Sequence, residues 1–219
     1  MTPKWEDYVR TQAVAADQIC LARARVIAGA KAAQETAQRA IREVLSNERR
    51  MQLTLRDLDR ARNQHRTRNQ HLARGDQRFS AGPSLWETDS VEGGYRDINM
   101  IINVLIYRFG GAHPYLQEMD TGEALGAMAQ ADLIDASVAT TLADAREFWL
   151  SLNLMRAWSG WSSPDVTPIR ARLGALLADG AGVRSFARVA PLIRGFIDDG
   201  NRLYGTLIQG QNDRLSSPR

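Results

Sequence analysis

A run of seven residues from Gly93 to Asn99 has the residue types that could bind a charged ligand. Two glycines before an apolar helix can form a tight turn whose backbone amides face an anion. Arg96 and Asp97 would then lie in the first turn of that helix. The alternative is a structural turn in which Asp97 serves as a capping or first-turn acid. The candidate site residues in this run are Gly93, Gly94, Arg96, Asp97 and Asn99.

Metal or redox chemistry has few candidate residues in this chain. Asp57 and Asp59 form an Asp-x-Asp pair of the kind that holds Mg²⁺ on a strand. They fall in an expected helix, where residues two apart point about 200° apart and cannot share one ion. Asp198 and Asp199 also fall in an expected helix and cannot share one ion. We therefore interpret both pairs as solvated helix charges. Cys20 is the only cysteine; it excludes an internal disulfide, and we expect it to be a small buried hydrophobe.

Basic charge is concentrated between Arg39 and Arg78, where eleven arginines face five acids, while the whole chain has a net charge of +3. Such clusters can bind nucleic acid or phosphate through counterion release. The segment has no aromatic residue for stacking on bases, so nucleic acid is the less favoured partner. We interpret the segment as a solvated face or a surface that docks an acidic protein. The candidate docking residues are Arg49, Arg56, Arg60 and Arg66.

Helical spacing and helix-end signals predict an all-α, multi-helix bundle. The expected helices cover residues 2–27, 30–45, 48–71, 97–109, 121–131, 135–158, 168–178 and 185–208. The apolar helix at 97–109 is expected to be buried and central, and Thr121 is the expected cap of the next helix. No apolar run approaches the roughly 18 residues of a membrane-spanning helix, and no secretory signal opens the chain. We therefore expect a cytoplasmic protein.

These elements predict one helical domain in four parts. Residues 1–74 form N-terminal helices with the basic face, residues 75–94 form a loop, residues 95–210 form the central and C-terminal helices, and residues 211–219 form a tail. The loop assignment rests on its glycines and proline.

Four further motifs accompany the glycine pair in a fixed order. They are Leu-Ala-Arg-Ala-Arg-Val-Ile-Ala-Gly at residues 21–29, Ile-Arg-Glu-Val-Leu at 41–45, Trp-Glu-Thr-Asp at 86–89 and Thr-Gly-Glu-Ala-Leu at 121–125. With Gly-Gly-Tyr-Arg-Asp-Ile-Asn-Met at 93–100, they resemble the helical domain that follows the nucleotidyltransferase domain in glutamine-synthetase adenylyltransferase. The PII-uridylyltransferase contains the same module. The resemblance covers about residues 16–210.

The chain departs from the family at charged positions. The family's lysine falls on Asp89, its glutamate after Asp-Ile falls on Asn99, and its Trp-Glu pair falls on Ala16 and Asp17. The catalytic domain's Gly-Ser helix start and strand Asp-x-Asp, which hold Mg²⁺ for phosphoryl transfer, are not found in the sequence. The Gly-x-x-x-x-Gly-Lys-Ser/Thr, Gly-x-Gly-x-x-Gly, His-Glu-x-x-His and Gly-x-Ser-x-Gly signatures are also missing. The family residues that remain are Gly93, Gly94, Asp97, Arg23 and Arg25.

The resemblance implies a non-catalytic helical domain in nitrogen regulation that assists nucleotide or protein-substrate binding. Its expected partner is a protein, namely a nucleotidyltransferase domain, glutamine synthetase or the PII protein. No cofactor is expected in this chain, and ATP and Mg²⁺ would enter only with a catalytic domain from a separate chain or from upstream sequence. One alternative is a standalone adaptor that kept the fold and lost the catalytic context. A self-sufficient nucleotidyltransferase with an unusual site is a third, less favoured hypothesis.

Overall fold

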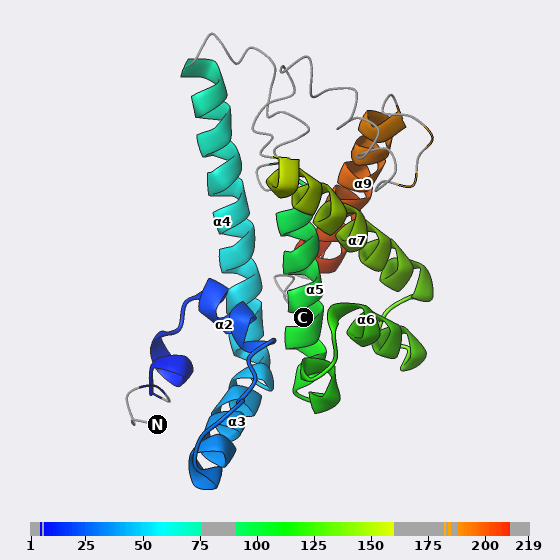
Figure 1. Cartoon of the computed structure of the whole chain (residues 1–219). Coiled ribbons are helices and arrows are strands. Elements are labelled where there is room, and N and C mark those ends of the chain that lie inside the picture. Colours follow the sequence, from blue (N-terminus) through cyan, green and yellow to red (C-terminus); the bar gives the residue numbers. More distant parts are fainter. Residues whose placement is uncertain are drawn as a thin grey trace.

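The structure, a computed structural model, describes residue 5 and residues 7–75, 91–159, 182, 184 and 188–210. All regular elements in this part of the chain are helical, which confirms the all-α multi-helix prediction. The expected helix at 168–178, the tail, and residues 76–90 of the expected loop lie outside the described residues. In chain order the elements are the π-helical turn η1 (Tyr8–Gln12), α2 (Ala15–Leu21), α3 (Lys31–Leu45), α4 (Glu48–Gly75), α5 (Tyr95–Gly110), the 3₁₀ helix η3 (Pro114–Gln117), α6 (Thr121–Gln130), α7 (Ala136–Ser159), α9 (Val189–Tyr204) and the π-helical turn η5 (Gly205–Gln209) (Figure 1).

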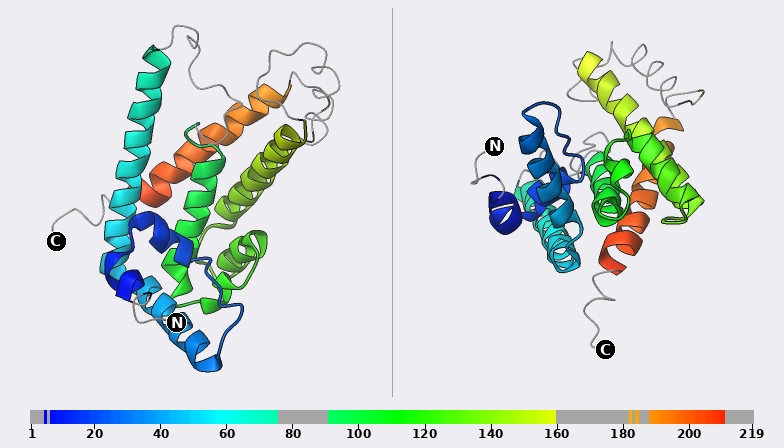
Figure 2. Two further views of the ribbon diagram at one scale, coloured as in Figure 1. Left: turned by 60° about the vertical axis from the view of Figure 1, so that its left-hand side comes forward. Right: turned by 90° about the horizontal axis from the view of Figure 1, so that it is seen from below.

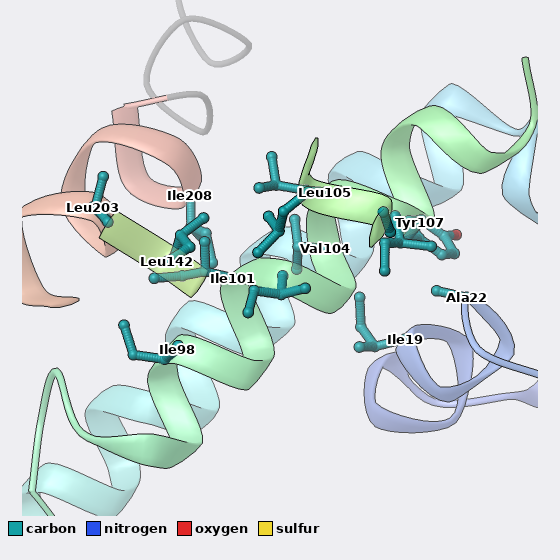
Figure 3. Close-up of a cluster of buried hydrophobic side chains, with 14 of the residues drawn as sticks. Ile19, Ala22, Ile98, Ile101, Val104, Leu105, Tyr107, Leu142, Leu203 and Ile208 are labelled. Carbon is teal, nitrogen blue, oxygen red and sulfur yellow. The ribbon is translucent and has the colours of Figure 1, made fainter. Parts of the chain in front are cut away.

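Helix α5 is the centre of the fold, as its apolar sequence predicts. It contacts α2, α3, η3, α6, α7 and α9, and Figure 2 shows it between the N-terminal helices and the α7–α9 pair. In Figure 3, Leu142, Leu203 and Ile208 lie on one side of α5, and Ile19 and Ala22 lie on the other. A helix that is apolar on all faces gains free energy only when neighbours cover every face. The buried apolar residues of α5 are Ile98, Ile101, Ile102, Val104, Leu105, Ile106 and Tyr107.

Helix α7 packs one face against α5, α6 and α9. Leu142, Ala145, Trp149 and Leu152 recur at spacings of three and four residues and are all buried, as expected for the apolar face of an amphipathic helix. Helix α4 is longer than predicted and strongly polar in sequence. Among the residues that the structure describes, no helix is both long and apolar enough to cross a membrane.

The prediction of one continuous helix from residue 2 to residue 27 is wrong in the described part of that range. The chain forms η1, breaks at Ala13 and Val14, forms the short α2, and is then irregular up to α3. The break is stabilised by one local and one tertiary hydrogen bond of the Gln18 side chain. The buried Gln18 amide donates to the Ala13 carbonyl at 2.6 Å, and its oxygen accepts from the Thr54 hydroxyl of α4 at 2.6 Å. Cys20 is exposed, because α2 turns its neighbour Ile19 to the core instead.

The cap of α6 is also one residue earlier than predicted. Asp120, not Thr121, is the N-cap residue, and its carboxylate accepts from the Glu123 amide at 2.8 Å. The Glu123 carboxylate accepts in turn from the Asp120 amide at 3.2 Å, which completes a capping box. This reciprocal pairing satisfies two amides that the first helical turn leaves open.

We expect Asp120→Ala to lower the free energy of unfolding by about 0.5–2 kcal/mol, because the α6 amides lose their acceptor. Asp120→Asn retains an acceptor oxygen and removes only the charge. It should therefore lower the free energy of unfolding by only a small fraction of the loss for Asp120→Ala. Urea unfolding followed by circular dichroism measures both. Equal losses for the two variants would show that charge, not capping, is what Asp120 contributes.

Candidate functional site

The glycine turn before α5 is closed on an acid from its own helix. Gly94 is the N-cap residue and Asp97 is the third helical residue. The Asp97 carboxylate accepts from the Gly93 amide at 2.8 Å, and Gly93 has a φ of 79°, a conformation open to glycine at little cost. The interpretation of Asp97 as a first-turn acid is therefore confirmed. The anion that faces the Gly93 amide is a side chain of the protein itself.

A second group, Arg62 of α4, completes the charge balance of Asp97. Its Nε and Nη2 atoms donate to the same Asp97 oxygen at 2.9 and 2.7 Å. The two side chains are only 13% and 8% exposed. The Arg62 Nη2 also donates to the Asn201 side-chain oxygen at 2.7 Å, and the guanidinium lies 3.9 Å from the centre of the Tyr204 ring. One arginine thus joins α4 to the start of α5 and to α9.

Arg62 was not predicted as a site residue, because it is one of eleven arginines in a basic segment. Its position does carry a signal. Leu55, Leu58 and Arg62 recur at spacings of three and four residues, and both leucines are buried. An arginine on the apolar face of a helix requires a buried acceptor.

Helix α9 packs directly against the backbone of the turn. A Cβ on Gly200 would lie 2.2 Å from the Gly93 carbonyl oxygen, and a Cβ on Gly93 would lie 2.2 Å from the Ile197 carbonyl oxygen. Only glycine fits at both places. The Asn201 amide also donates to the Glu92 carbonyl at 3.2 Å, which fixes α9 to the residue before the turn.

Tyr204 lies under Arg62 and is fully buried. Within the described residues its hydroxyl has no hydrogen-bond partner. Burial raises the pKa of Tyr204, the negative charge of Asp59 raises it further, and Arg62 opposes the shift. The side chain therefore remains a neutral phenol at physiological pH and is a packing surface for the guanidinium.

The other predicted residues of the run have different surroundings. Gly94 is buried beside Gly93, whereas Arg96 is exposed. Asn99 is half-buried and donates to the Tyr95 carbonyl at 3.1 Å, one turn earlier. The run therefore divides into an internal part and an outward-facing arginine. A role for these residues in lining a cleft stays a prediction.

The predicted docking arginines lie on α4. Arg56 is exposed, and Arg60 is exposed and pairs with Asp57 at 3.1 Å. The side chains of Arg49 and Arg66 lie outside the described residues.

The two members of the Asp-x-Asp pair do not converge. Asp57 is held by Arg60 at 3.1 Å, whereas Asp59 accepts from Gln209 of η5 at 2.8 Å. In the described part of the chain, no group of three or more His, Cys, Asp or Glu residues could hold a metal ion.

No protein-family model matches the chain, and no curated protein sequence matches it either. The resemblance described above rests on its motifs.

Two glycines of α9 provide a matched test of the close approach. Gly200→Ala places a methyl group against the Gly93 backbone and should lower the free energy of unfolding by about 1–3 kcal/mol. Gly195→Ala meets nothing within 4 Å and should raise it by roughly 0.5–1 kcal/mol, because alanine favours the helix. Chemical denaturation of both variants measures the difference. A neutral or stabilising Gly200→Ala would contradict the described packing of α9.

The buried ion pair should behave as a coupled unit. Arg62→Met or Asp97→Asn alone should each lower the free energy of unfolding by about 3–5 kcal/mol, since each leaves an unpaired buried group. The double variant should lose clearly less than the sum of the two. Arg60→Met, which breaks an exposed pair, should cost less than about 1 kcal/mol. Strict additivity in this cycle would refute the pairing.

Proposed function

We propose that this chain is a non-catalytic helical domain of the kind that follows the nucleotidyltransferase domain in glutamine-synthetase adenylyltransferase. It would assist nucleotide or protein-substrate binding by a catalytic domain supplied from elsewhere. One observation carries the proposal: two of the family residues that the chain retains, Gly93 and Asp97, are used to join three helices. Retention of this motif preserves a scaffold, which is what a supporting domain requires.

The chemistry of the turn agrees with a supporting role. One oxygen of the Asp97 carboxylate accepts three hydrogen bonds, two from Arg62 and one from Gly93. A carboxylate that is already neutralised by an arginine is a poor ligand for Mg²⁺ and a poor proton acceptor. Asn99 stands where the family has glutamate, and a neutral amide cannot replace the charge of a carboxylate ligand.

The outer surface offers a means of docking. Exposed cations lie on α4 at Arg56 and Arg60 and in the first turn of α5 at Arg96. An acidic face on a partner would be attracted to them, and this attraction would weaken with salt. The proposed partners are a nucleotidyltransferase domain, glutamine synthetase or the PII protein, in the cytoplasm. ATP and Mg²⁺ would belong to the catalytic partner.

The second candidate function is a standalone adaptor that binds a partner without supporting catalysis. The internal hydrogen bond of Asn99 to Tyr95 favours this candidate. At the position of the family's glutamate, this chain has a side chain that bonds within its own helix.

A reconstitution assay separates these functions. The purified chain is incubated with labelled ATP or UTP, Mg²⁺ and glutamine synthetase or the PII protein, with and without a separate nucleotidyltransferase domain. We expect no transfer by the chain alone and faster transfer when both are present. Transfer by the chain alone would overturn the proposal, and binding of a partner without faster transfer would favour the adaptor.

The docking surface has its own matched variants. Arg56→Glu combined with Arg60→Glu should weaken partner binding at least tenfold in a pull-down or calorimetric titration. Arg194→Glu, at an exposed position of α9, should leave binding unchanged. Equal effects of the two substitutions would assign the binding to net charge and not to the α4 surface.

A further inference from the structure

Helix α4 has an exposed leucine among its arginines. Leu53 is 54% exposed, and Arg56 and Arg60, which follow it at spacings of three and four residues, are exposed as well. These spacings place the three residues on one face of the helix, opposite the buried Leu55 and Leu58. We call Leu53, Arg56 and Arg60 the arginine face of α4. An apolar side chain with charges around it is typical of a surface that docks a protein, because protein interfaces have an apolar centre and a polar rim.

Helix α7 has a similar face with charges of the opposite sign. Asp144 and Glu147 are three residues apart and both exposed. Leu154, seven residues after Glu147, is 65% exposed. Spacings of three and seven residues place the three on one face of the helix, which we call the acidic face of α7. Among the described residues, no ion pair involves either acid.

The charges of the segments around the two faces are equal in magnitude. Residues 39–78 contain eleven arginines and five acids, a net charge of +6, and residues 118–147 contain seven acids and one arginine, a net charge of −6. All seven of these acids are exposed. Surfaces of opposite sign attract each other over distances that the ionic strength sets. The chain therefore carries the electrostatic complement of its own arginine face.

The two faces lie too far apart in the fold to meet within one molecule. In Figures 1 and 2, helix α5 lies between α4 and α7. An acidic partner for α4 therefore has to be another molecule, and a second copy offers such a face at the same concentration. Because the two faces differ and belong to separate sides of the fold, each copy can bind one neighbour through α4 and another through α7. A contact of this kind is heterologous, or head-to-tail.

We propose that the arginine face of α4 docks onto the acidic face of α7 of a second copy of this chain, in a head-to-tail assembly. The exposed leucines supply the apolar contact, and the surrounding charges set the orientation and the on-rate. The inference does not rest on the proposed function. A catalytic partner that used Arg56 and Arg60 would compete with the second copy for the same face.

Sedimentation velocity of the purified chain alone, at several concentrations, tests the assembly. In about 0.05 M NaCl the average mass should rise with concentration, and in about 1 M NaCl, where the screening length is about 3 Å, it should return to that of the monomer. Arg56→Gln with Arg60→Gln (the α4 variant) should weaken association at least tenfold. Asp144→Asn with Glu147→Gln (the α7 variant) should do the same. Leu154→Ser, which changes no charge, should also weaken it.

A mixing experiment separates the two faces from the effect of net charge. The α4 variant retains the acidic face and the α7 variant retains the arginine face, so an equimolar mixture should form dimers that grow no further. Arg188→Gln with Arg194→Gln removes the same charge as the α4 variant from exposed positions and should leave association unchanged. Circular dichroism checks that every variant is folded.

Three results would overturn the proposal. The first is wild type that stays monomeric at low salt. The second is an α4 or α7 variant that associates like wild type, and the third is a mixture of the two that remains monomeric. Monomeric wild type that binds polyglutamate or a DNA duplex would assign the arginine face to a different anionic partner.

Discussion

The ion pair between Arg62 and Asp97 is the interaction on which the arrangement of the helices depends. Both groups lie in a region of low dielectric, where a charge without its partner is strongly unfavourable. Helix α4 is polar over most of its length, so its apolar residues alone contribute little to its packing against the core. The pair fixes α4 against the start of α5, and the bond from Arg62 to Asn201 brings α9 to the same point. Arg62 therefore joins three helices that are far apart in sequence.

Two groups of arginines show opposite solutions to the same physical problem. Arg62 is balanced by a carboxylate, an amide oxygen and an aromatic face, all within the fold. Arg23 and Arg146 each have one nitrogen that is shielded from solvent and has no partner in the described part of the chain. A balanced guanidinium contributes to the architecture, whereas a shielded nitrogen without an acceptor lowers stability.

Sequence periodicity was sufficient to predict the helices whose packing is decided by their own apolar pattern. The buried α5 and the apolar face of α7 followed from residue spacing, and the acid at Asp97 followed from its place in the first turn. Two failures involve partners distant in sequence, Thr54 for Gln18 and Asp97 for Arg62, whereas the cap of α6 is a local pair that begins one residue earlier than predicted. The bonds of Gln18 to Ala13 and Thr54 interrupt a helix that local propensity favours. Gly200 weakens a helix by propensity, yet its contact with Gly93 is the reason only glycine fits there.

The hydrogen bond from the Gly93 amide has a consequence for the motions of the molecule. Its acceptor is a carboxylate that is itself held by α4, and α9 covers the turn from the other side. The amide hydrogen can exchange with solvent only after these contacts separate, so a loop residue acquires the protection of a core residue. This single backbone position therefore reports the opening of the unit formed by α4, α5 and α9, although it belongs to none of these helices.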